Sequence, residues 1–203
     1  MNSLLSINSF YNKPNKHVYT YLSVLNGNFT SPTVASGGQT SLTTTTQLTS
    51  WSMDNLGSNV RILNNLLNDN ASPYSYNATL LDGTSEKTVL FIAQANGAQT
   101  TNISQNISFS NTNTYTISFW AAPRKVYYNS SQSLSLYVNG VLMTLNGSLS
   151  NVTFTSGTST QPFVHYTTSF TPSTAGTYSI DFRWTATQTV DSTIMLTGIQ
   201  IYQ

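Results

Sequence analysis

The chain has 203 residues and no cysteine, which excludes disulfide bridges, thiolate nucleophiles and cysteine-based metal sites. Charged residues make up only 6% of the chain, against about 25% in typical domains, and 7 Lys and Arg nearly balance 6 Asp and Glu. This balance excludes the basic surface that nucleic acid or an anionic membrane requires, and no run of about 18 apolar residues predicts a transmembrane helix.

Solubility must therefore come from neutral polar groups, since the chain contains 22 Asn, 29 Ser and 32 Thr. Such surfaces are common on secreted proteins, adhesins and particle shells. The segment Met1–Asn8 has neither the basic start nor the apolar stretch of a secretory signal, so we expect no signal peptide.

The first part of the chain carries weak periodicity. We predict an N-terminal arm or an extra strand over residues 1–24 and one domain over residues 25–203. The polar stretch Thr30–Ser50 is predicted to be a loop or a loose edge strand. The spacing of Val60, Leu63 and Leu67 indicates a helix over Asn59–Asn68, although its four Asn compete with the helical backbone.

From there on, β-branched and aromatic residues alternate with Ser and Thr between Gly, Pro and Asn clusters, as in strands. In Tyr178–Trp184, for example, four apolar residues share one face and Ser179, Asp181 and Arg183 share the other. One buried and one wet face predict an all-β, antiparallel β-sandwich, and Asn139-Gly140 predicts a tight hairpin. The predicted strands are Val18–Leu25, Thr88–Ala95, Thr101–Phe109, Thr114–Ala121, Ser133–Asn139, Val141–Leu145, Val152–Thr155, Phe163–Phe170, Thr177–Thr185 and Thr193–Tyr202.

Catalytic residues are hard to place. Glycoside hydrolysis needs two carboxyl groups across a cleft, and a catalytic triad needs a histidine. The chain has six carboxylates, several of them in turns, and two histidines. His17 lies in the arm, and His165 lies in a predicted strand, where histidine is usually structural. We therefore expect no enzyme and no metal centre.

The 24 aromatic residues indicate a different chemistry, because aromatic rings stack on the apolar faces of sugars. Aromatics at period two are usually core, and Trp184 is in phase with Phe182 and Ile180. Trp120 is out of phase with its neighbours, and Tyr127 and Tyr128 follow Arg124 in a predicted loop. The predicted sugar-binding residues are Trp120, Arg124, Tyr127 and Tyr128, and Trp51 is predicted to cap the sandwich.

A series of short motifs over residues 25–203 resembles the galactose-binding-domain-like jelly rolls, which include many carbohydrate-binding modules. The motifs come in the order found in that family: Leu25–Phe29, then Trp51, Ile103–Phe109, Tyr115–Trp120, Val138–Gly140, Phe170–Tyr178 and the closing strand Ile194–Tyr202. The resemblance implies jelly-roll topology and a glycan as partner.

The same resemblance raises the question of calcium. In the family, an acidic residue after the opening Phe and an Asp in the closing strand can help to hold a structural Ca²⁺. Here these positions are Thr30 and, approximately, Thr197-Gly198, which lack the carboxylates that Ca²⁺ prefers. We therefore expect no cofactor.

Two functions remain open on these grounds. The chain is predicted to be a structural or attachment component on the surface of a virus particle, with other particle or shell proteins, or further copies, contacted through residues 1–24. The alternative is an extracellular carbohydrate-binding module or lectin.

Overall fold

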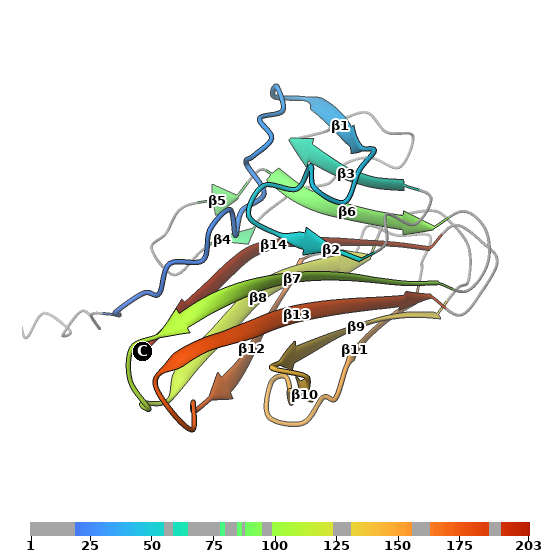
Figure 1. Cartoon of the computed structure of the whole chain (residues 1–203). Coiled ribbons are helices and arrows are strands. Elements are labelled where there is room, and N and C mark those ends of the chain that lie inside the picture. Colours follow the sequence, from blue (N-terminus) through green and yellow to red (C-terminus); the bar gives the residue numbers. More distant parts are fainter. Residues whose placement is uncertain are drawn as a thin grey trace, which may run out of the picture.

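Two antiparallel sheets face each other across an apolar core (Figure 1). In the computed structural model, the described residues are 19–54, 59–64, 78–79, 85–86, 88–94, 99–123, 131–155, 163–186 and 192–203. No helix occurs in these ranges, so none could cross a membrane. The predicted all-β sandwich is confirmed.

Sheet A has six strands, and it contains both the first and the last strand of the described residues. Its order is β1 (Gly38–Leu42), β3 (Asn59–Asn64), β6 (Thr88–Gln94), β14 (Ser192–Tyr202), β8 (Tyr115–Pro123) and β12 (Val164–Phe170). The polar stretch before Ser50 therefore supplies an edge strand, one of the two predicted outcomes.

Sheet B lies opposite and is built mainly from long strands. Its order is β10 (Val141–Leu142), β9 (Ser131–Val138), β13 (Gly176–Ala186), β7 (Gln99–Phe109) and β2 (Ser52–Met53), with β11 (Val152–Thr155) also paired to β9. A separate two-stranded ribbon joins β4 (Ala78–Thr79) and β5 (Ser85–Glu86). From β6 to β9, and again from β12 to β14, the chain changes sheet at each strand, which gives the jelly-roll topology.

The inner faces of the two sheets supply the core. Trp184 and Phe182 of sheet B are fully buried, and the Phe182 ring meets the Phe119 ring of sheet A edge to face at 5.0 Å. Trp51 closes one side as predicted: it is buried beside Phe182, and its indole N–H donates to the Asn26 carbonyl at 3.2 Å.

The predicted helix over Asn59–Asn68 is wrong, since residues 59–64 form β3 between β1 and β6. Val60 and Ile62, two residues apart, are both buried, which is strand periodicity. Pairing with β1 and β6 satisfies the backbone hydrogen-bonding groups of this segment. Its Asn residues have a low helix propensity, so they do not favour a helix over this pairing.

The predicted strand over Val18–Leu25 is also not formed in its described part. Tyr21 makes only an isolated bridge to Tyr202. The Thr20 amide donates to the Gln203 carbonyl at 2.9 Å, and the Leu22 amide donates to the Ile201 carbonyl at 2.8 Å. This short segment therefore lies along the C-terminal end of β14 (Figure 1).

The hairpin predicted at Asn139-Gly140 is confirmed. Both residues have positive φ, 51° and 79°, as the tight turn between twisted strands requires. The strand that follows is only Val141–Leu142, shorter than the predicted Val141–Leu145.

Candidate functional site

The outer side of sheet B, which we call the polar face, is lined by short neutral side chains and one charged cluster. On β7, β9 and β13 buried residues alternate with partly exposed ones, so the latter point away from the core. The strand register aligns Tyr137, Asp181 and Ser104 in one row and Ser135, Arg183 and Asn102 in the next.

Arg183 is the central side chain of this face. Its Nε donates to Oδ2 of Asp181 at 2.8 Å, and its guanidinium carbon lies 3.8 Å from the centre of the Tyr137 ring. The ion pair and the cation–π contact hold the guanidinium from two sides; at exposed sites a cation–π contact contributes about 0.5–1 kcal/mol and an ion pair about 0.2–1 kcal/mol. The arginine is therefore oriented before any ligand arrives.

The same cluster keeps hydrogen-bonding capacity for a ligand. No hydrogen bond within the described residues reaches the Nη atoms of Arg183 or the hydroxyl of Tyr137. Oδ1 of Asp181 and Oδ1 of Asn102 also lack a partner there, but both atoms are buried and are not exposed to a ligand. The polar face thus offers oriented donors beside an aromatic ring and a ladder of hydroxyl groups.

Both carboxylates on or beside this face are engaged by the protein. Asp181 accepts from Arg183, and Asp54 accepts from the backbone N–H and the side-chain amide of Asn102 at 2.8 and 2.6 Å. Both carboxylates are therefore held by contacts within the protein.

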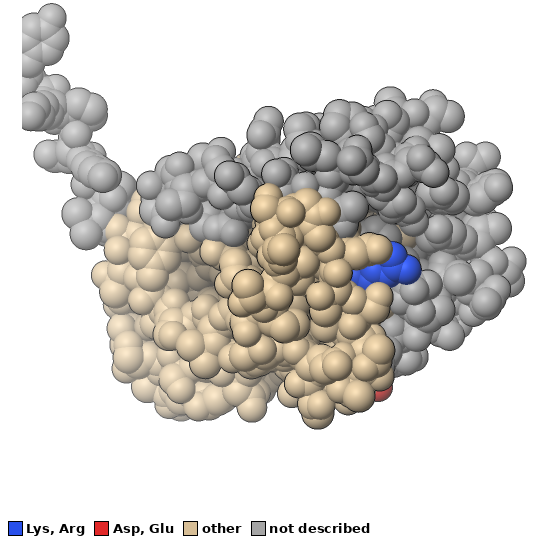
Figure 2. All heavy atoms as spheres, turned by 90° about the horizontal axis from the view of Figure 1, so that it is seen from above, with Lys and Arg blue, Asp and Glu red and all other residues tan. Residues whose placement is uncertain are grey.

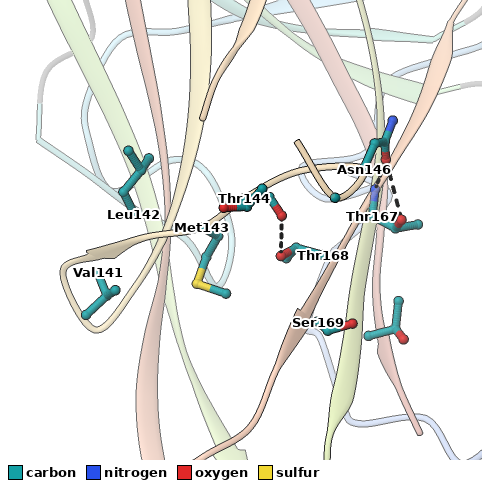
Figure 3. Close-up of a pocket in the computed structure, with 10 residues that line it drawn as sticks. Val141, Leu142, Met143, Thr144, Asn146, Thr167, Thr168 and Ser169 are labelled. Carbon is teal, nitrogen blue, oxygen red and sulfur yellow. Dashed lines mark hydrogen bonds between the residues drawn. The ribbon is translucent and has the colours of Figure 1, made fainter. Parts of the chain in front are cut away.

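A second feature, the edge groove, lies where the two sheets end (Figure 3). It has a volume of about 650 Å³ and runs between the β9–β10 hairpin and the outer strand β12. Its walls carry no titratable side chain, and they are formed by Thr116, Val141, Leu142, Met143, Thr144, Asn146, Gly147, Thr167, Thr168 and Ser169.

Among the predicted sugar-binding residues, only Trp120 is in a described range. It points away from the core, as predicted, but His165 of β12 stacks on its ring at 4.7 Å and an interplanar angle of 25°. Burial in this stack lowers the pKa of His165 below its usual 6.5. Trp120 therefore has one ring face covered, and its role in sugar binding stays a prediction.

Arg124, Tyr127 and Tyr128 lie outside the described residues, and so does His17. Sequence analysis identified Asp181 and Arg183 as outward-facing but missed Tyr137. The alternation in Leu134–Val138 carried that signal, because Tyr137 lies out of phase with three buried residues.

The position that would carry a calcium carboxylate in the family is occupied by a buried hydroxyl. Thr197 is fully buried, and its Oγ1 donates to the Thr88 carbonyl at 2.7 Å. Within the part of the chain that the structure describes, no three His, Asp or Glu side chains gather closely enough to hold a metal ion.

Charge is scarce on the surface as well (Figure 2). Apart from small areas of blue and red, the described surface in that view is uncharged. Besides Glu86 of β5, the charged residues in the described ranges are Asp54, Arg61, Asp181 and Arg183.

Comparison with known proteins finds no matching family model and no matching curated protein. Solved structures do resemble the chain. The enzymatically active domain of tailspike protein 4 from bacteriophage CBA120 is 16% identical with a TM-score of 0.47, over 89% of this chain but only 21% of its own.

Carbohydrate-binding modules recur among these structures, as the motifs predicted. A family 61 module, solved with β-1,4-galactotriose, is 10% identical with a TM-score of 0.42, over 75% of this chain and 88% of its own. A family 4 module is 16% identical with a TM-score of 0.43, over 89% and 100%. The fold assignment rests on the chain's own two sheets.

Proposed function

We propose that the chain is a non-catalytic glycan-binding protein that serves as a structural or attachment component on the surface of a virus particle. The observation that carries the glycan proposal is the oriented Arg183 on the polar face, held by Asp181 and Tyr137. Holding a donor group in place before binding removes part of the entropy cost of association.

The chemistry of the polar face fits a sugar better than it fits other ligands. Sugar hydroxyls accept from guanidinium N–H groups, and the apolar faces of sugar rings pack on aromatic rings such as that of Tyr137. The positive charge of Arg183 is balanced by Asp181, so the face attracts neither strong anions nor cations. The partly exposed Ser104, Ser135 and Thr185 extend this hydrogen-bonding surface along the strands.

A glycan microarray probed with the full chain tests the proposal, followed by affinity measurements on the best ligand. Tyr137→Ala and Arg183→Gln are each expected to weaken binding at least about tenfold, which corresponds to about 1.4 kcal/mol. Arg61→Gln is the matched control, because it removes the same charge from β3 of the opposite sheet. Absence of any glycan signal at millimolar concentration would contradict glycan binding. Loss of binding only in Trp120→Ala would instead support the sugar site predicted on sheet A.

The particle setting is supported by the uncharged surface rich in Ser, Thr and Asn. The alternative setting is an extracellular lectin. Quantitative mass spectrometry and antibody labelling of purified particles distinguish the two: the proposal predicts the chain on the particle exterior, whereas its presence only in particle-free medium would favour the alternative.

A further inference from the structure

The edge groove lies between two open strand edges. β12 ends sheet A and β10 ends sheet B. Part of the β12 edge is already closed, because Asn146 imitates a neighbouring strand: its N–H donates to the Thr167 carbonyl at 2.8 Å, and its Oδ1 accepts from the Thr167 N–H at 2.9 Å. In a strand, the backbone N–H and C=O groups of every second residue point to the same side. The groups of Thr167 point away from β8 toward Asn146, so the groups of Ser169 also point away from β8.

No hydrogen bond from the described residues reaches the backbone N–H or C=O of Ser169, which lines the groove. On the other side, the Met143 N–H donates to the Leu136 carbonyl of β9 at 2.8 Å. By the same alternation, the backbone groups of Leu142 face away from β9. An exposed strand edge of this kind is a template for the addition of another strand.

The side chains around the groove select what such a strand can be. Val141 and Met143, two residues apart, lie on one face of the chain and form an apolar ledge, on which Val141 is 65% exposed. Leu142, between them, points to the opposite side (Figure 3). Hydroxyl groups of Thr116 and Thr167 belong to the other wall. With no charge in the lining, the groove fits an uncharged extended segment whose side chains alternate between apolar and polar.

The N-terminal segment of this chain has that pattern. In Leu5-Ser6-Ile7-Asn8-Ser9, two apolar residues alternate with small polar ones, and the first charged side chain is Lys13. Its anchor is close to the groove: Tyr21 bridges Tyr202, Tyr202 pairs with Thr116, and Thr116 pairs with Ser169. Three strand spacings place Ser169 about 14 Å from Tyr21.

The 18 residues before Tyr19 can span up to about 60 Å when extended, so the segment reaches well beyond its own sheet. To enter the groove of its own copy, the N-terminal segment would have to cross the ends of β14 and β8 and then reverse its direction. If each of two copies places its segment in the groove of the other, no reversal is needed and the pair has two-fold symmetry.

We propose that residues 3–9 of a second copy of this chain add as a short strand at the Ser169 edge of the groove, with Leu5 and Ile7 against Val141 and Met143. The backbone of the added segment then satisfies the open groups of Ser169. This inference is independent of glycan binding, because Tyr137, Asp181 and Arg183 do not line the groove.

Cross-linking of the full chain tests the proposal directly. Val141 is replaced by a photoreactive phenylalanine analogue, and this chain is mixed with a heavy-isotope-labelled unmodified copy before illumination. The expected product joins position 141 to residues 3–9 carrying the heavy label. Cross-links that reach only the same copy's segment, or none in residues 3–9, would overturn the proposal.

Sedimentation of the full chain gives a second readout. Ile7→Asp, Val141→Asp and Ser169→Pro are each expected to weaken self-association at least about tenfold, the last because proline removes the edge N–H while remaining compatible with an edge strand. Leu149→Asp is the matched control, since Leu149 is 41% exposed but does not line the groove. A chain that stays monomeric at all concentrations, or equal weakening by Leu149→Asp, would contradict the proposal.

Discussion

The buried side chain of Gln132 ties the two sheets together, and its removal makes a quantitative prediction. Its Nε2 donates to the Thr193 carbonyl of β14 at 2.7 Å, and its Oε1 accepts from the Trp184 indole N–H at 3.1 Å. Gln132 is 1% exposed, so water cannot replace either bond. Gln132→Leu keeps the side-chain volume similar and removes both bonds.

The expected cost follows from the two groups left behind. The Trp184 N–H becomes a buried donor without a partner, which costs about 1–3 kcal/mol, and Thr193 loses one bond worth about 0.5–1.5 kcal/mol. Together these give about 2–4 kcal/mol. For a chain of this size the melting temperature falls by about 2–4 °C per kcal/mol, so we expect a decrease of roughly 5–15 °C.

Urea and thermal unfolding followed by tryptophan fluorescence measure this effect. Gln200→Leu is the control, because Gln200 is partly exposed and makes no side-chain hydrogen bond with the other described residues; its effect should stay within about 0.5 kcal/mol. If Gln132→Leu is as stable as the parent chain, the inter-sheet contact shown here does not exist in solution.

Two further predictions concern a close backbone approach and a titration. A Cβ on Gly27 would lie 2.4 Å from the Ile199 carbonyl oxygen, so Gly27→Ala should lower the melting temperature clearly, and an unchanged value would refute that packing. His165 should titrate below 6.5 in NMR because burial disfavours its charged form. Since the unfolded state then binds the proton more readily, this contribution to stability is complete above pH 6.5 and is lost as pH falls from 6.5 through the lowered pKa. A midpoint above 6.5 would contradict the stacked, partly buried position.

Period-two patterning located most of the sandwich, because half-buried strands record their burial in the sequence. Val152–Thr155 was predicted with the bounds that the structure has, and Phe163–Phe170 was one residue longer than β12. The predictions failed where pairing with distant segments determines the secondary structure. Asn59–Asn64 becomes a strand only because β1 and β6 flank it, and those partners are not encoded locally.

The candidate site was less predictable than the fold. The sequence analysis placed Arg183 on an outward face and missed Tyr137, which lies 46 positions earlier in the chain. Only the β9–β13 register, which aligns Tyr137 with Asp181, brings the ring under the guanidinium. The register between neighbouring strands of a sheet depends on packing and turn geometry, so it could not be predicted from alternation alone.

The most direct test of glycan binding at the polar face is a backbone amide NMR titration of the full chain with its best glycan. We predict that chemical-shift changes concentrate on β9 and β13 around Tyr137 and Arg183. Changes confined to the outer side of sheet A near Trp120, or no saturable change, would contradict this assignment.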